Sequence, residues 1–421
     1  MGNGWRWEKM GICAGGLMLA GLVFSWCGAA TSFGAPPKQA ASNLTQYSVD
    51  PYYTMFTDVE MAQVKEAAAR MAAMGMIYTQ QCEPFSARPG SYRWPFYLYA
   101  KHEEYTGAPG VPGGSAGVFM PSAGKLMADA SYGDEVWHIV QHEGFHQFAF
   151  SMIARNLPVW LNEGLAEYFG ESLWTGAGMV TGNIPSHRLV RIKELIAKDD
   201  LVAFDKMIAM QQTEWNGALK IKNYDQAFFM VTFLLQGGGQ TIRDHFVAYV
   251  KDLSHGKAPK AAWTGQFGPD TDGFLKQFTT WVNGLTDETS KPLRTRAAFE
   301  TLMSYLARAH CEKQDFDSIE DFFKAGEDGT VKVKEDLLWY LPPSLLTKRV
   351  KEARELKDWS LEKAKDGTPK LTLTLSDGTV YTGTVGASPD SRRPPATKVT
   401  VETPKAPKAA TTKPGDAASK P

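Results

Sequence analysis

Residues 141–150 read QHEGFHQFAF and place two histidines one helical turn apart. Because residues four apart lie on the same face of an α-helix, the imidazoles of His142 and His146 can reach a single metal ion. Glu143 is rotated to the edge of that face, where a carboxylate can reach a water on the ion rather than the ion itself. A hydrolytic zinc needs this division between ligands and a general base, so the stretch predicts such a site.

Apolar residues around the motif predict that its helix, roughly residues 134–153, is largely buried. They stand at Val136, Ile139, Val140, Phe145, Phe148 and Ala149. Two unliganded histidines on a buried helix would need other partners. Gly144 costs roughly 1 kcal/mol relative to alanine in a helix, so we expect either the next helix or a strand beside the site to approach closely there. His138, one turn earlier, is expected to pack or to support a ligand.

A third ligand is expected on the following helix. The pattern HExxHxxGxxH fails, because Ala149 and Met152 stand where it needs a glycine and a histidine. The segment PVWLNEGLAEYFG, residues 158–170, instead offers Glu163, with sixteen residues between it and His146. That spacing lets the first helix end and a second helix return antiparallel to it, so that Glu163 points back at the two histidines.

Two more residues complete the expected site. Glu167, one turn after Glu163, is suited to bind the free ring nitrogen of a ligand histidine and to fix its orientation. Tyr224 is a candidate donor for the oxyanion of the transition state, with a core tyrosine as the alternative. Asn223 before it is a possible helix cap, and Tyr224 shares an apolar stripe with Ala227, Phe228 and Val231. The histidines expected to be structural or exposed are His187 and His245.

HEGFH followed by WLNEGLAEY resembles the gluzincin metallopeptidases, and it is similar in particular to the bacterial peptidase-MA-like proteins. The resemblance covers about residues 50–285, with specific paired motifs and a loose match elsewhere. It implies that His142, His146 and Glu163 bind Zn²⁺ and that Glu143 is the base. In the related aminopeptidases a tyrosine also lies at a comparable distance beyond the glutamate, in keeping with the place of the candidate oxyanion donor.

The expected activity is zinc-dependent hydrolysis of peptide bonds in a peptide or protein substrate. The G-x-M-E-N element that grips a free N-terminus in aminopeptidases is missing, and GVFMP at residues 117–121 offers no glutamate in its place. An endopeptidase is therefore favoured. The alternatives are a non-catalytic envelope or binding protein that keeps the fold, which the intact Glu143 argues against, and a zinc hydrolase of a non-peptide amide. The sequence does not indicate an oligomeric state.

The N-terminal segment and the net charge predict where the protein is found and which partners it lacks. The 421 residues carry a formal net charge of −1, which gives no general attraction to nucleic acid. Residues 1–30 combine a basic start with an uncharged apolar run and read as an export signal, or as an uncleaved membrane anchor. The mature protein is expected in the periplasm, in the cell envelope or outside the cell.

The domain boundaries follow shifts in composition. A linker is expected at 31–43, a gluzincin-like catalytic domain at 44–290, and a C-terminal helical region with a β-hairpin at 291–385. The Pro, Ala and Lys-rich tail at 386–421 is expected to be disordered. Cys82 and Cys311 could pair or stay free.

The predicted fold class is α+β, a zincin-like domain that is mainly helical with a small β-sheet. A strand is predicted at 95–100, and a hairpin joins 118–120 to 125–130. A second hairpin is predicted at 371–385 around Asp377-Gly378. The further predicted helices are 61–78, one beginning near Pro158, 187–198, 223–235, 274–285, 294–309 and the charged segment 350–366.

Overall fold

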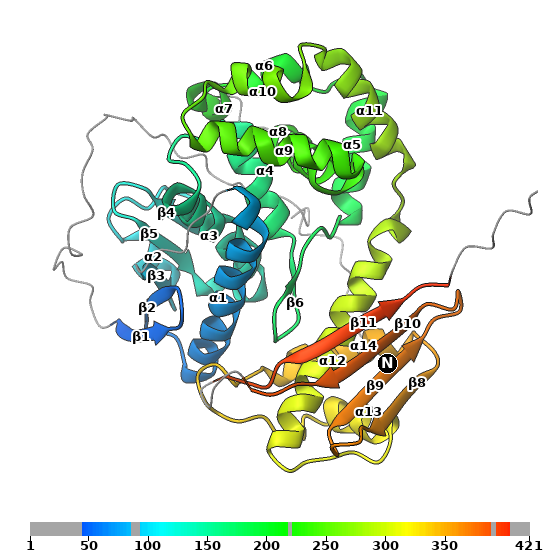
Figure 1. The fold of residues 1–421 in the computed structure, drawn as a ribbon. Helices are drawn as coiled ribbons and strands as arrows, with labels where there is room; N and C mark the ends of the chain where they lie inside the picture. The colour runs from blue at the N-terminus through cyan, green and yellow to red at the C-terminus, as the bar shows by residue number, and fades with distance from the viewer. Residues whose placement is uncertain (1–43, 86–92, 218–220, 389–392, 405–421) are drawn as a thin grey trace, which may run out of the picture.

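A computed structural model describes residues 44–85, 93–217, 221–388 and 393–404. The predicted leader and linker, residues 1–43, lie outside these ranges. In the described part, many helices accompany three sheets of five, four and two strands, which agrees with the predicted α+β class (Figure 1). No helix in it is long and apolar enough to cross a membrane.

A five-stranded mixed sheet lies beside the motif helix. Its strands, in spatial order, are β1 (Thr45–Val49), β2 (Tyr53–Thr57), β3 (Trp94–Tyr99), β5 (Lys125–Asp129) and β4 (Gly117–Met120). The central strands β2, β3 and β5 run parallel, while β1 and β4 are antiparallel to their neighbours. The predicted strand at 95–100 and the hairpin after it are confirmed. Strand β4 forms one edge of the sheet, and this edge faces the site described below.

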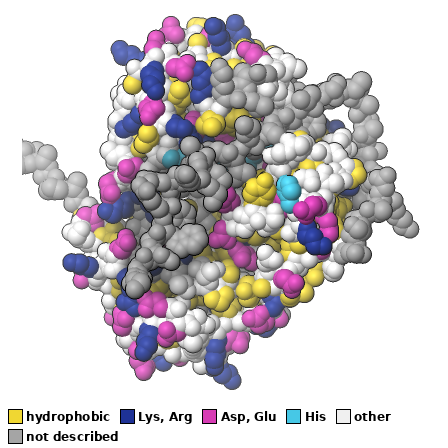
Figure 2. Space-filling model, turned by 180° about the vertical axis from the view of Figure 1, so that it is seen from behind, with side chains coloured by type: hydrophobic (Ala, Val, Ile, Leu, Met, Phe, Trp, Pro, Cys, Tyr) yellow, Lys and Arg dark blue, Asp and Glu magenta, His cyan; other side chains and the backbone are white. Residues whose placement is uncertain are grey.

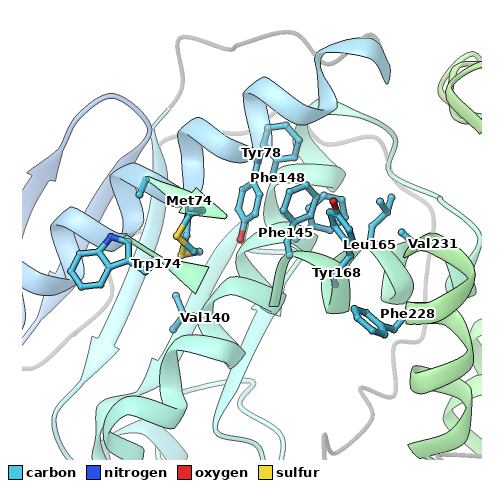
Figure 3. Close-up of a cluster of buried hydrophobic side chains, with 14 of the residues drawn as sticks. Met74, Tyr78, Val140, Phe145, Phe148, Leu165, Tyr168, Trp174, Phe228 and Val231 are labelled. Carbon is cyan, nitrogen blue, oxygen red and sulfur yellow. The ribbon is translucent and has the colours of Figure 1, made fainter. Parts of the chain in front are cut away.

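Helices α1 (Met61–Cys82) and α3 (Val136–Met152) pack on each other and on this sheet. Figure 3 shows Tyr78 of α1 among aromatic rings of α3, with its ring centroid 5.7 Å from that of Phe145 and 5.5 Å from that of Phe148. The Tyr78 hydroxyl also donates a hydrogen bond of 2.5 Å to the carbonyl of Gln141. The apolar face of α1 therefore fixes the start of the motif.

Gly144 lies where α1 packs tightly against α3. A Cβ at this position would lie 2.9 Å from Cε of Met74 and 3.4 Å from the hydroxyl oxygen of Tyr78, both on α1. The next contact is a Leu126 methyl of β5 at 3.7 Å. The expectation that the next helix or the strand beside the site makes this approach is therefore wrong. The glycine lets the core helix α1 sit directly under the motif.

After α3 the next helix packs against it, and the following ones form a helical layer above the sheet (Figure 1). The last of the series, at residues 291–311, runs from this layer to the C-terminal region. The helices predicted in this part of the chain are confirmed to within three residues at either end, and the helix predicted at 61–78 is confirmed but extends to Cys82. The others of this layer were not expected from the sequence. The helices are α4 (Val159–Gly170), α5 (Ser186–Ala197), α6 (Phe204–Ala209), α7 (Gln212–Gly217), α8 (Ile221–Thr232), α9 (Gly239–Ser254), α10 (Pro259–Phe267), α11 (Thr271–Gly284) and α12 (Lys291–Cys311).

The C-terminal region packs a four-stranded antiparallel sheet on α12. The predicted hairpin is confirmed as β9 (Pro369–Thr374) and β10 (Val380–Val385). The charged segment 350–366 is helical only to the end of α14 (Pro343–Arg354), and β8 (Trp359–Lys363) follows. That prediction was wrong because Trp359 and Leu361 alternate with polar residues, and the Trp359 ring stacks on Phe299 of α12 at 5.8 Å.

The predicted disorder of the tail at 386–421 is wrong for one segment. Residues Thr397–Glu402 form β11, which pairs with β10 along its whole length. Threonine and valine dominate TKVTVE, and both residue types favour strands. Residues 389–392 and 405–421 lie outside the described range.

The two cysteines of the described residues do not pair. Cys82 is buried at the end of α1, and Cys311 is exposed at the end of α12. Burial raises the pKa of the Cys82 thiol, so this side chain stays protonated and behaves as a small apolar group.

Acidic and basic side chains are interspersed over the face of the molecule shown in Figure 2. This agrees with the formal net charge of −1. The described part of this face carries no broad region of one sign that would dominate the electrostatic field.

Candidate metal centre

Three donor atoms converge where α3 and α4 face each other. The Nε2 atoms of His142 and His146 lie 3.1 Å apart, and Oε2 of Glu163 lies 3.3 Å from the first and 3.5 Å from the second. Donors bound at 2.0–2.1 Å to a tetrahedral zinc lie about 3.3 Å from one another. The three distances therefore match the edges of a zinc coordination tetrahedron, with one corner left for a further ligand.

Gly164 allows the helix of Glu163 to reach this position. A Cβ at Gly164 would lie 2.5 Å from the carbonyl oxygen of Ala227 and 2.7 Å from a methyl of Val231, both on α8. Only glycine lets α4 and α8 pack this closely, and Figure 3 shows Val231 beside α4. Gly164, the glycine of the NEG triplet, thus sets the distance between α4 and α8.

Gln141 ties the other end of α4 to the motif helix. Its side-chain amide donates to the carbonyl of Gly170 at 2.7 Å, and it also contacts the carbonyls of Phe169 and Ser172. The carbonyls of Phe169 and Gly170 belong to the last turn of α4 and have no partner within the helix, and Ser172 lies two residues beyond its end. Gln141, the residue just before His142, therefore caps the helix that carries Glu163.

Glu143 lies against the edge strand β4. Its Oε2 accepts a hydrogen bond of 2.8 Å from the backbone N–H of Phe119, and only 4% of the residue is exposed. Burial raises the pKa of Glu143, although the two histidines and this hydrogen bond act against the rise. A carboxylate with a raised pKa accepts protons more readily, as a general base at neutral pH must.

His146 and Glu163 shift each other's pKa values in the directions that favour their charged forms. Burial would raise the pKa of Glu163, but His146 and His142 outweigh burial and lower it to about 2. Burial would lower the pKa of His146, but the carboxylates of Glu163 and Glu143 outweigh burial and raise it to about 9. The cluster thus favours an ionised glutamate and draws in a proton, as a site built around a cation does.

Glu167 lies behind the first ligand, where the sequence predicts it. Its Oε1 is 3.5 Å from Nδ1 of His142, a contact longer than a full hydrogen bond. Burial raises the pKa of Glu167, but Arg188 and the nearby histidines outweigh burial and lower it, so the carboxylate stays ionised. Nδ1 of His142 is buried and has no other hydrogen-bond partner among the described residues. Glu167 is therefore placed to orient this ring.

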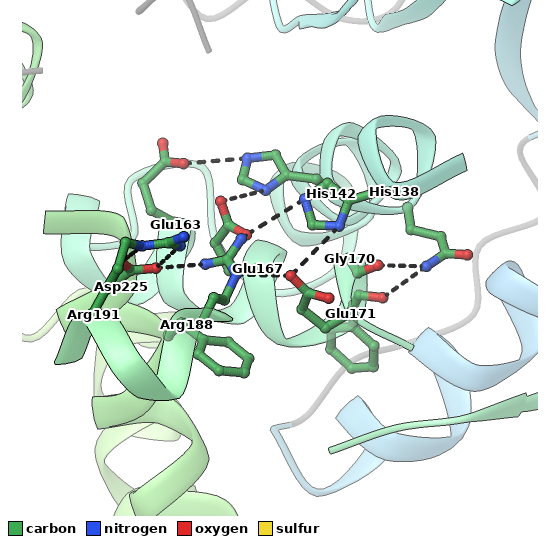
Figure 4. Close-up of polar contacts among 12 residues, drawn as sticks. His138, His142, Glu163, Glu167, Gly170, Glu171, Arg188, Arg191 and Asp225 are labelled. Atoms are coloured by element: carbon green, nitrogen blue, oxygen red, sulfur yellow. Dashed lines mark hydrogen bonds and ion pairs between the residues drawn. The ribbon is translucent and has the colours of Figure 1, made fainter. Parts of the chain in front are cut away.

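A buried charge network extends from Glu167, and the sequence pattern did not indicate it. Figure 4 shows Arg188 of α5 between Glu167 of α4, Glu171 just after that helix and Asp225 of α8. Arg191, one turn later, binds both oxygens of Asp225 at 2.5 and 2.8 Å. In SHRLVRIKEL the arginines read like the solvated face of a helix, and only the fold shows that acidic residues surround them.

The other histidines stay out of the ligand cluster. His138 is half-buried, with its ring nitrogens 3.6 Å from Glu167 and 3.8 Å from Glu171, so it supports the site from behind as expected. His187 and His245 are exposed on α5 and α9.

Tyr224 lies on α8 at the site, half-buried. Its ring packs edge to face against Trp215 of α7, with 5.1 Å between the ring centroids. Burial raises the pKa of Tyr224, and the carboxylates of Glu163, Glu167 and Glu143 add to the rise. The phenol therefore stays protonated near these carboxylates and is able to donate a hydrogen bond. Asn223, expected as a helix cap, lies instead inside α8 and is buried.

Residues 137–259 match a family model described as "Protein of unknown function (DUF1570)". No curated protein and no solved structure matches the chain. The matched segment contains nearly all of α3 and the whole of α4, α5 and α8. It therefore includes the three converging donors and the charge network, whereas the edge strand β4 lies before it.

Proposed function

We propose that this protein is a zinc metallopeptidase in which His142, His146 and Glu163 hold Zn²⁺ and Glu143 is the general base. The observation that carries the proposal is the set of distances of 3.1, 3.3 and 3.5 Å among the three donor atoms. Side-chain packing alone seldom brings two imidazole nitrogens and a carboxylate oxygen together in a buried site. The edge strand, the helix of HEGFH and the helix of Glu163 together support a zincin-like fold.

The charge balance of the site supports a divalent cation. The carboxylates belong to Glu143, Glu163, Glu167, Glu171 and Asp225, and the guanidinium groups to Arg188 and Arg191. With neutral histidines, five carboxylates against two guanidinium groups leave three negative charges in a largely buried region. Buried charges of one sign are costly unless they are compensated. A divalent ion would neutralise two of the three negative charges. The raised pKa of Glu143 makes its protonation easier and so lowers the cost of the third.

The chemistry divides among the residues as follows. When bound, zinc would supply Lewis acidity that polarises a carbonyl and makes water more acidic. Glu143 accepts a proton from the attacking water and delivers it to the leaving amine. Tyr224 donates a hydrogen bond to the oxygen on which negative charge develops.

The edge strand β4 favours a peptide over other amides as substrate. The backbone N–H of Asp129 bonds the carbonyl of Ala116, which makes this a hydrogen-bonded pair of the antiparallel ladder. By alternation, Phe119 opposite Leu126 is a non-bonded pair, so its backbone groups point away from β5: its N–H bonds Glu143, and its carbonyl faces outward. An extended peptide that pairs with this edge would lie next to Glu143. Since such pairing requires no free N-terminus, it supports an endopeptidase.

The proposal is tested with purified full-length protein and the variant Glu143→Gln. Glutamine keeps an oxygen for the Phe119 N–H but cannot carry the proton. We expect one zinc per chain in both proteins. We also expect cleavage within a peptide library by the wild type, reduced by roughly 100-fold or more in the variant.

The outcomes separate the alternatives. A wild-type protein without zinc contradicts both metalloenzyme hypotheses. If the protein binds zinc but cleaves no peptide, the result favours a non-catalytic binding protein. If it cleaves cell-wall fragments instead of peptides, the result favours a hydrolase of another amide. Full activity of Glu143→Gln would show that another group is the base. Export through residues 1–30 and membrane anchoring there remain predictions from the sequence.

A further inference from the structure

We propose that Arg188 is a positioning residue that fixes the orientation of His142 by holding Glu167 in place. The inference rests on the proposed zinc site and adds a residue of a third helix, α5, to it. Arg188 is 7% exposed and makes no contact with the three proposed ligands among the described residues. Its effect on the metal must therefore pass through a neighbouring side chain.

The guanidinium of Arg188 contacts three carboxylates. Nη2 contacts Oε2 of Glu167, Nε lies 2.7 Å from Oε1 of Glu171, and Nη1 lies 3.3 Å from Oδ1 of Asp225. Three nitrogens thus lie within ion-pair distance of carboxylates on α4, on the residue that follows α4 and on α8, and Nη2 and Nη1 also donate hydrogen bonds. A planar guanidinium can do this in one fixed geometry, while the single ammonium of lysine cannot.

The two carboxylate oxygens of Glu167 have different partners. Oε2 is taken by Arg188, which leaves Oε1 facing Nδ1 of His142 at 3.5 Å. A carboxylate anchored on one oxygen has little freedom to rotate its other oxygen away from the ring. Arg188 therefore sets the direction from which His142 is held, and with it the direction of the Nε2 lone pair.

The same guanidinium also reaches the helix of the proposed oxyanion donor. Asp225, which binds Arg188 and Arg191, follows Tyr224 directly in α8 and is fully buried. One side chain thus connects the third-ligand helix α4 with α8, as Figure 4 shows. The relative position of these two helices is defined by charge as well as by the close packing at Gly164.

A second metal site explains this cluster less well. Ligand atoms of His138, Glu167 and Glu171 lie close enough together to hold an ion. Arg188 already contacts both carboxylates and is the cation there. An ion among these residues would stand beside a buried guanidinium and would be repelled by it.

The test measures zinc affinity by competition with a chromophoric chelator in four full-length proteins: wild type, Arg188→Lys, Glu167→Gln and the double variant. We expect Arg188→Lys to weaken zinc binding by roughly 10-fold to 100-fold, the range found when groups that orient ligands are lost. If Arg188 acts through Glu167, the double variant binds zinc no more than about twofold more weakly than Glu167→Gln. If Arg188 acted through packing alone, the fold-losses of zinc affinity in the two single variants would multiply in the double variant.

Arg308→Lys is the matched control. Arg308 is equally buried, but it donates to the carbonyls of Trp339 and Gly176 and contacts no carboxylate among the described residues. We expect this control to lower the thermal midpoint and to leave zinc affinity unchanged. Because Arg188→Lys keeps the charge, it is expected to fold, and Arg188→Gln is the second variant if it does not.

Two results would overturn the inference while leaving the zinc site intact. The first is equal zinc affinity in wild type and Arg188→Lys. The second is a double variant whose loss of zinc affinity equals the product of the losses in Arg188→Lys and Glu167→Gln. A wild-type protein that binds no zinc would overturn the proposed function as well, so the two failures are distinguishable.

Discussion

Among the single residues of the site, His146 and Glu163 give the clearest electrostatic support for the proposed cation. Their pKa values move apart, to about 9 for the imidazole and about 2 for the carboxylate, although burial acts against both shifts. In the metal-free protein His146 therefore holds a proton at neutral pH, in the position where a metal would act. Glu163 is ionised throughout the neutral range and contributes no pH dependence there.

Zinc affinity is accordingly expected to rise with pH. Binding must displace the proton on His146, whose pKa is raised to about 9, so that affinity increases by up to about tenfold per pH unit between pH 6.5 and 9 and then levels off. An unperturbed histidine would level off near pH 6.5. The measurement is chelator competition across this range, corrected for the protonation of the chelator. A constant affinity between pH 7 and 8.5 would contradict the expected charge state of His146.

Among the helices and strands, the site depends on how closely α4 approaches its neighbours. It lies between α3, which supplies the histidines, and α8, which supplies Tyr224. Gly164 faces the α8 backbone, and Gln141 caps the far end of α4. The motif WLNEGLAEY therefore supplies both a proposed ligand and the packing that places it.

Gly164→Ala is expected to destabilise the protein and to weaken zinc binding. The added methyl would lie 2.5 Å from a backbone carbonyl of α8, so the helices must separate, at a cost of roughly 1–3 kcal/mol. Gly178→Ala is the matched control, because a Cβ there meets no atom within 4 Å. Urea unfolding should place the control within about 0.5 kcal/mol of wild type. Equal stability of the two variants would show that α4 and α8 pack less tightly than described.

The sequence predicted the parts of the site whose spacing is local. His142, His146, Glu163 and Glu167 follow helical periodicity, so their spacing alone places them on two facing helices. The Arg188 network could not be predicted, since it joins α4, α5 and α8 and its arginines look like surface residues. The strand at Trp359–Lys363 was missed for a different reason: a charged helical pattern continues into it, and pairing with β9 decides its conformation.

Across the molecule as a whole, the site forms where the sheet and the helical layer meet. The edge strand β4 contributes the Phe119 contact to Glu143, and the helical layer contributes Glu163, Arg188 and Tyr224. The C-terminal sheet packs on α12, and Arg308 of that helix donates to the carbonyl of Gly176, in the turn between β6 (Leu173–Trp174) and β7 (Met179–Val180). The C-terminal region thus supports the domain that carries the site.

The most direct test of the central claim is the position of zinc in a crystal of the full-length protein, located by anomalous scattering at the zinc edge. We predict one peak within about 2.0–2.2 Å of Nε2 of His142, Nε2 of His146 and a carboxylate oxygen of Glu163. Glu163→Gln should lower its occupancy at the same zinc concentration. A crystal grown with zinc that shows no peak there, or a peak only between His138 and Glu171, would contradict the account.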